Sequence, residues 1–183
     1  MKHIAALLLI APLAISHAQM SPALEDSLAN IPNSGQRTAA LRSYARTSDP
    51  ETLLAIMRVA RTIPNSTDKS RLLETLAPRD LGGDSTLSRA YFRVARTVPS
   101  SEELSDLLIF IVPYAAKSDQ ITNAIIETAR GVPSSPQRSD VLIALVESGA
   151  VRSNAVRESF VDATLDIPGE YDRRQVMRAA SRH

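Results

Sequence analysis

One short phrase returns five times along this chain, and its spacing restricts what the chain can fold into. The phrase is an Ile or Val, a proline and two small or polar residues. Its prolines lie 32 to 35 residues apart, at Pro32, Pro64, Pro99, Pro133 and Pro168. A period of this length indicates stacked supersecondary units, because one unit cannot bury its apolar face alone. We therefore expect an all-α fold, a right-handed α-solenoid of about four to five helical hairpins of 34–35 residues.

Each proline is followed by the signals of a first helix. A serine stands two residues past the proline, where its hydroxyl can cap a helix start; the set is Ser34, Ser66, Ser101 and Ser135, with Glu170 in the last copy. Apolar residues recur eight, nine and twelve residues past the proline, as at Leu107, Leu108 and Ile111. These offsets place them on one face of a helix.

A second helix is expected to run up to the next proline. Its starts carry the capping residues Asp49, Asp84, Ser118 and Ser153. The residue eight before each proline is always apolar, and the set is Leu24, Ile56, Tyr91, Ile125 and Phe160. Proline disfavours helical geometry in the residue before it, so this helix ends there. We expect about ten helices, with a short polar one over 20–30 and an arginine-rich one over 170–183 closing the two ends.

The N-terminus has the three parts of a secretory signal peptide. Lys2 gives a basic start, residues 4–15 are apolar except for Pro12, and small residues precede a cleavage site after Ala18. The apolar run is too short to span a bilayer as a helix, which takes about 20 residues. We expect residues 1–18 to be removed, residues 19–183 to form a single helical repeat domain, and the protein to be periplasmic or secreted.

The composition limits the classes of partner. Cleavage removes one basic residue of 21 and none of the 20 acidic residues, so the remaining chain has no net charge and, after cleavage, no anchor in the membrane. A chain without net charge has no global field that would recruit nucleic acid. There is no cysteine, so packing must stabilise the fold without disulfides. We expect a monomer that binds a protein or peptide and no nucleic acid.

The repeat resembles two families. Its 34-residue spacing and terminal proline look like tetratricopeptide repeats, but the small residue of their first helix is replaced here by Arg42, Glu74, Ile109 and Ile143. The segment from Ile63-Pro64-Asn65-Ser66 to Leu72-Leu73 is similar to HEAT- and TPR-like repeats in extracytoplasmic parts of bacterial proteins, some attached to M56-type peptidase sensors. This resemblance implies a repeat module without an activity, since the His-Glu-x-x-His motif of those peptidases is missing.

Residues for catalysis are scarce, and we expect no enzyme and no cofactor. Only His183 remains after cleavage, so neither a Ser/His/acid triad nor a His or Cys metal site can be assembled. Acid pairs such as Glu102-Glu103 leave a carboxylate-based glycan hydrolase as an alternative. Adjacent residues point to different sides of a helix, however, and acids favour a first helical turn.

Cations recur five residues past the repeat prolines, at Arg37, Lys69, Arg138 and Arg173, with Leu104 as the exception. A cation early in a helix opposes the helix dipole, so its recurrence needs a reason. One interpretation is that these side chains reach the unpaired carbonyls that end the preceding helix. The other is a partner-binding edge for an acidic partner. Arg61, Arg96 and Arg130 also recur, three residues before a proline.

The sequence thus predicts an exported, non-catalytic scaffold that binds a protein or peptide partner. The alternative is a structural component of the envelope that assembles by stacking of like ends. Neither the partner nor the binding face is specified by the residues alone.

Overall fold

The computed structural model describes residues 21–46, 49–81 and 83–183. These residues form ten helices and no strand, so the predicted all-α class is confirmed. The helices are α1 (Pro22–Ala29), α2 (Ser34–Ala45), α3 (Pro50–Ala60), α4 (Ser66–Asp80), α5 (Ser85–Ala95), α6 (Ser101–Ala115), α7 (Asp119–Arg130), α8 (Ser135–Glu147), α9 (Asn154–Leu165) and α10 (Glu170–Ala180). In this part of the chain, none of them is long and apolar enough to cross a membrane. The expected signal peptide, residues 1–18, lies outside the described residues.

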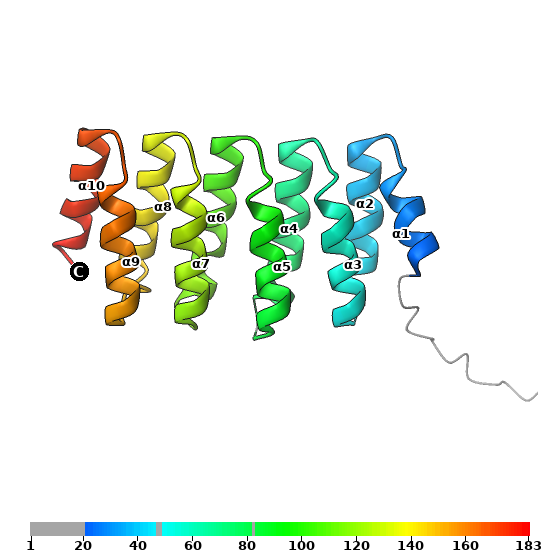
Figure 1. Ribbon diagram of the computed structural model, residues 1–183, viewed down its shortest axis with the longest axis horizontal. Helices are drawn as coiled ribbons and strands as arrows, with labels where there is room; N and C mark the ends of the chain where they lie inside the picture. Colours follow the sequence, from blue (N-terminus) through cyan, green and yellow to red (C-terminus); the bar gives the residue numbers. More distant parts are fainter. Residues whose placement is uncertain (1–20, 47–48, 82) are drawn as a thin grey trace, which may run out of the picture.

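The helices lie in two rows (Figure 1). Row A contains α2, α4, α6, α8 and α10, and each packs on the next member of its row. Row B contains α1, α3, α5, α7 and α9, which pack in the same way. Each helix of row B leads into its row A neighbour through a loop at the top of the view, and these loops contain the repeat prolines. Equivalent residues of successive units therefore recur along the length of the molecule.

Row A helices begin one residue earlier than the serines predict. The capping residue is the one directly after the proline: Asn33 Oδ1 accepts from the Gln36 N–H at 2.9 Å, and Asn65 Oδ1 accepts from the Asp68 N–H at 2.9 Å. Ser34, Ser66, Ser101 and Ser135 are the first helical residues, so their assignment as caps was wrong. An asparagine side chain caps a helix as well as a serine does. Which of the two neighbouring residues caps the helix is decided by which side-chain oxygen lies next to the free N–H groups of the first turn.

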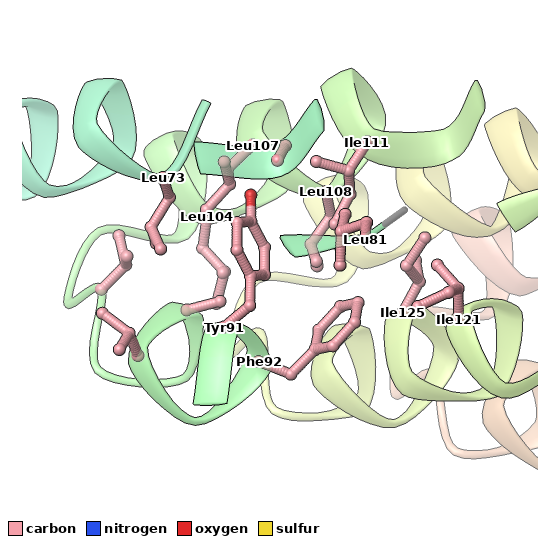
Figure 2. Close-up of a cluster of buried hydrophobic side chains, with 14 of the residues drawn as sticks. Leu73, Leu81, Tyr91, Phe92, Leu104, Leu107, Leu108, Ile111, Ile121 and Ile125 are labelled. Carbon is pink, nitrogen blue, oxygen red and sulfur yellow. The ribbon is translucent and has the colours of Figure 1, made fainter. Parts of the chain in front are cut away.

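The apolar stripes of both rows meet in one continuous core. Leu107, Leu108 and Ile111 of α6 are fully buried, as the spacing predicts. Figure 2 shows them around Tyr91 and Phe92 of α5, whose rings meet edge to face with centroids 5.5 Å apart. Burial of such side chains is the main stabilising term of the fold, at about 25 cal/mol per Å² of apolar surface.

The two ends of the rows differ from the interior. Met177 occupies the register of Leu41, Leu73, Leu108 and Leu142, which are all 0% exposed, yet it is 47% exposed. Val161 occupies the register of Met57, Phe92 and Ile126, which are buried, and is 52% exposed. The sequence predicts these apolar residues as core. They are exposed because no further helix pair follows α10 in the structure.

Candidate functional site

The four cations predicted as a partner-binding edge line the loops between the rows, and three of them are buried. Arg37 of α2 donates through Nε and Nη2 to the Ile31 carbonyl, at 3.0 and 2.6 Å, and through Nη1 to the Thr62 carbonyl, at 3.2 Å. Ile31 lies in the loop between α1 and α2, whereas Thr62 belongs to the loop of the next unit. One guanidinium therefore satisfies orphan carbonyls in two successive units.

Lys69 and Arg138 repeat this arrangement. The Lys69 ammonium donates to the Thr97 carbonyl at 2.9 Å, and burial lowers the pKa of this lysine. Arg138 donates to the Val132 carbonyl at 2.8 Å and to the Asp166 carbonyl at 2.9 Å. These contacts are the ones that the capping interpretation expects, extended to a second loop. A role of the four cations in partner binding stays a prediction.

Arg173 and Leu104 occupy the two remaining positions five residues past a repeat proline, and they show what the contact between a cation and two loops requires. Arg173 of α10 is half-buried and donates to the Ile167 carbonyl at 3.3 Å, with no further unit in the structure to supply a second loop. Leu104 of α6 replaces the cation and is buried. The loop residue of the following unit that corresponds to Thr62 and Thr97 is Gly131, which has no hydroxyl to accept from a cation. Leu104 and Gly131 therefore belong to the same pair of successive units, and we call the contact between these units the junction at Leu104.

A different set of arginines is exposed on row B, in two neighbouring grooves that we call the arginine grooves. The groove between α5 and α7 has a volume of about 260 Å³ and is lined by Ser88, Arg89, Phe92, Arg93, Arg96, Gln120, Ile121 and Ala124. The groove between α3 and α5 has about 190 Å³ and is lined by Leu54, Met57, Arg58, Arg61, Ala90, Arg93 and Val94. Arg93 lines both of them, so they flank α5 and form one surface.

The charge of the arginine grooves is unbalanced. No acidic residue is among those that line them. Arg58 pairs with Glu25 of α1 at 2.8 Å, and Arg89 donates to the Thr86 hydroxyl at 3.4 Å. Within the described chain, Arg61, Arg93 and Arg96 form neither an ion pair nor a side-chain hydrogen bond. Three guanidinium groups are thus free to bind an anion.

The floor of the grooves is apolar. Phe92 and Ile121 close the bottom of the α5–α7 groove and are buried; Figure 2 shows the Phe92 ring lying toward Ile121 and Ile125. Met57 and Val94 have the same place in the α3–α5 groove. The arrangement is suited to a ligand that carries both carboxylates and apolar groups, because arginine binds carboxylates in a two-pronged geometry.

Sequence reasoning found only part of this site. It noted Arg61 and Arg96 as recurring cations but missed Arg58 and Arg93, which share a register three residues earlier. The identical 35-residue separation of the two pairs was the signal that could have found them. Arg130, the third member of the predicted set, is neutralised by Glu127 and Asp166 of its own surroundings.

Groups suited to catalysis do not come together in the part of the chain that the structure describes. No cluster of three or more His, Cys, Asp or Glu side chains with metal-site geometry occurs there. Glu103, one of the predicted acid pair, accepts from the Thr67 hydroxyl at 2.6 Å. Asp80 has a pKa raised by burial to about 7, but its side chain is fully buried and lines neither arginine groove.

Comparison with known protein families, with curated proteins and with solved structures gives no match for this chain.

Proposed function

We propose that this chain is an exported, non-catalytic helical-repeat scaffold that binds an acidic segment of a protein or peptide partner through the arginine grooves. In this proposal the two rows wind as a right-handed α-solenoid, and the protein acts in the periplasm or outside the cell, as the resemblance to bacterial extracytoplasmic repeats implies. The observation that carries the proposal is the set of five arginines in two adjoining grooves without a lining acid.

The partner is defined by what the grooves offer. Arg61, Arg93 and Arg96 supply donors for carboxylates, and the buried Phe92 and Met57 side chains supply a floor for apolar groups. An extended segment that alternates acidic and apolar residues satisfies both. A folded domain with an acidic loop would use the same contacts.

The proposal is tested with a labelled peptide of alternating glutamate and leucine, and fluorescence anisotropy as the readout. Binding should weaken about 10-fold or more when Arg93 and Arg96 are both changed to alanine, since one lost hydrogen bond to a charged group costs about 1.5–3 kcal/mol and about 1.4 kcal/mol is a factor of ten. Binding should also weaken as salt rises, because exposed charges are screened over about 8–10 Å at physiological ionic strength.

Two matched controls make this test specific. Changing Arg71 and Arg42 to alanine removes the same charge from exposed positions of row A and should leave binding unchanged. A peptide with glutamine in place of glutamate tests whether the carboxylates are needed. Equal loss of binding in both double variants, or tighter binding of a single-stranded oligonucleotide than of the acidic peptide, would contradict the proposal.

A further inference from the structure

The end of the molecule formed by α9 and α10 exposes an apolar surface that the interior units bury. Four of the six large apolar side chains that are exposed in the described chain lie on these two helices, and they are Val161, Leu165, Tyr171 and Met177. Val161, Leu165 and Met177 line a cavity of about 160 Å³ together with Phe160 and Ala180. We call the surface of Phe160, Val161, Leu165, Met177 and Ala180 the C-terminal face.

The interior of the protein shows what covers such a surface. Phe92 and Leu108 have the registers of Val161 and Met177, and both are buried by packing on the following helix pair. Each row helix is covered by the next member of its row. The occupant of the C-terminal face should therefore also be a helix pair with an apolar stripe.

A further unit stacked in the same way is disfavoured by Arg174. Six residues past the repeat proline, the interior units have a small buried hydroxyl residue: Thr38, Ser70, Ser105 or Ser139. Ser139 Oγ donates to the Asp172 carbonyl at 3.2 Å, and Ser70 Oγ donates to the Glu103 carbonyl at 3.4 Å, so the next row A helix lies close. Arg174 fills this position in α10 with a large exposed side chain. A translated copy would have to displace this side chain and its ion pair with Glu170.

The row B side of the same face has no such obstacle. Arginine stands three residues before the proline in the three interior units, at Arg61, Arg96 and Arg130, whereas α9 has Leu165. Leu165 lies one helical turn from Val161, so the two form an apolar ridge along α9. The opposite end of the molecule offers no matching surface, since α1 and α2 expose no large apolar side chain among the described residues.

The charges along the hairpin of α9 and α10 are arranged for an antiparallel partner. Its loop end carries three acids, Asp166, Glu170 and Asp172, together with Arg173 and Arg174. Its other end carries four arginines and one acid, the arginines being Arg152, Arg157, Arg178 and Arg182 and the acid Glu158. Asp166 pairs with Arg130 and Glu170 pairs with Arg174, so the loop end is close to neutral while the other end is basic. A twofold axis across α9 therefore places the basic end of one copy against the near-neutral end of the other and keeps the two basic ends apart.

We infer that the C-terminal face binds the same face of a second copy of this chain, with α9 crossing the partner's α9 around a twofold axis. The contact is isologous and therefore closes at two copies. The two helices of the face, with 12 and 11 residues, are about 18 and about 16 Å long at about 1.5 Å per residue. Two such helices give a small interface, and small interfaces are typical of weak, concentration-dependent association.

Analytical ultracentrifugation across the micromolar range tests the inference. The mature chain should shift from one-chain to two-chain mass as its concentration rises, and Leu165→Asp should weaken this association at least tenfold. Leu165 is 56% exposed, so at concentrations where both chains are monomeric the change should leave the circular dichroism spectrum unaltered. Phe110→Asp is the matched control, because Phe110 is 46% exposed on α6, away from the C-terminal face. A chain that stays monomeric throughout, or a dimer lost in Phe110→Asp but kept in Leu165→Asp, would overturn the inference.

Cross-linking separates the twofold contact from a head-to-tail one. The chain contains no cysteine, so a single introduced cysteine can form a disulfide only with the same cysteine of a second molecule. Val161→Cys or Leu165→Cys should give an oxidised dimer, since residues close to the axis come within the Cα separation of about 4.4–6.8 Å that a disulfide requires. Phe110→Cys should not. Failure of both α9 variants to cross-link in solutions where the two-chain mass is present would rule out the proposed geometry.

Discussion

Arg138 shows that one side chain can connect two successive units of a repeated structure. Its guanidinium donates to carbonyls of two loops that are 34 residues apart in the chain, those of Val132 and Asp166. Without it both carbonyls lose a charged donor in a buried place. Arg173 has the same register but a single partner, the Ile167 carbonyl. The two arginines thus separate the contribution of the second loop from that of the first.

We expect Arg138→Gln to lower the free energy of unfolding by about 1–3 kcal/mol, the usual cost of leaving buried polar groups unpaired. Arg173→Gln should lower the free energy of unfolding less, by about 0.5–1 kcal/mol, because only one carbonyl loses its donor. Urea denaturation measures both. Equal losses would mean that the second loop contributes nothing, and weaker binding of the acidic peptide in either variant would favour the partner-binding interpretation.

Asp80 is the residue whose protonation should affect stability most. Its carboxyl group is fully buried and both oxygens lack a hydrogen-bond partner in the described chain. Burial raises its pKa to about 7; Arg79 opposes this shift and Asp84 adds to it. The folded chain therefore keeps a proton that the unfolded chain loses near pH 4. Stability from this group is complete below about pH 4 and falls as the pH rises toward 7.

The change Asp80→Asn should remove this dependence. We expect the variant to be more stable than the natural chain at pH 8, and its unfolding free energy to change less between pH 5 and pH 8. The full effect between pH values below 4 and above 7 is of the order of 4 kcal/mol, at about 1.4 kcal/mol per pKa unit, and roughly 2.7 kcal/mol of it falls between pH 5 and pH 8. Thermal unfolding at the two pH values checks it. A variant that is less stable by the same amount at both would show that the carboxylate is held by a favourable contact.

Among the helices, α6 shows most directly that the two faces of one element have different roles. Leu108 is fully buried, whereas Phe110, two residues later, is 46% exposed. Two residues correspond to about 200° around a helix, so the side chains point to opposite sides. Hydrophobicity alone does not separate them, but the repeat register does.

Replacing Leu108 by alanine should lower the free energy of unfolding by about 2–5 kcal/mol, because it leaves a cavity in the core. Replacing Phe110 by alanine should change it by no more than about 0.5 kcal/mol, as is usual for surface positions. Denaturation in urea distinguishes the two. A small effect at Leu108 would contradict the alignment of the units.

The helices were predictable from sequence because the period and the prolines set their limits independently of distant contacts. The capping residues were predictable only to within one position, since Asn65 and Ser66 are both suitable caps and the local backbone decides. The arginine grooves were not predictable, because Arg58 and Arg93 are ordinary surface residues until α3 and α5 lie side by side. The exposure of Met177 was also not predictable. Its position in the repeat predicts burial against a following helix, but the repeat does not tell whether the structure has such a helix.

At the scale of the whole molecule, each element contacts mainly its neighbours in the two rows. The positions of charge follow from this arrangement: row B carries the arginine grooves, and row A carries acids such as Asp106 and Asp140. Asp140 has a pKa raised by burial and by the neighbouring Asp172 and Asp106. An acidic partner should therefore be attracted to the arginine grooves and repelled by the part of row A around Asp106, Asp140 and Asp172.

Export is the prediction that concerns the whole chain. The basic start, the apolar run and the small residues before Ala18 predict cleavage there, so the exported protein should begin at Gln19. Intact mass spectrometry of protein from the periplasm or the medium checks this. A full-length species that stays with the membrane fraction would contradict it.

The junction at Leu104 has a consequence for how the protein opens. At the neighbouring junctions a buried cation joins two loops by directional hydrogen bonds, which are lost together when the units separate. At the equivalent position Leu104 is apolar and buried and the corresponding loop residue is Gly131, so this directional bond is missing there. Chains of stacked units unfold in cooperative blocks whose limits lie at the weakest junction. Hydrogen exchange should therefore divide the protein into two blocks, α1–α6 and α7–α10, each with its own protection and its own response to denaturant.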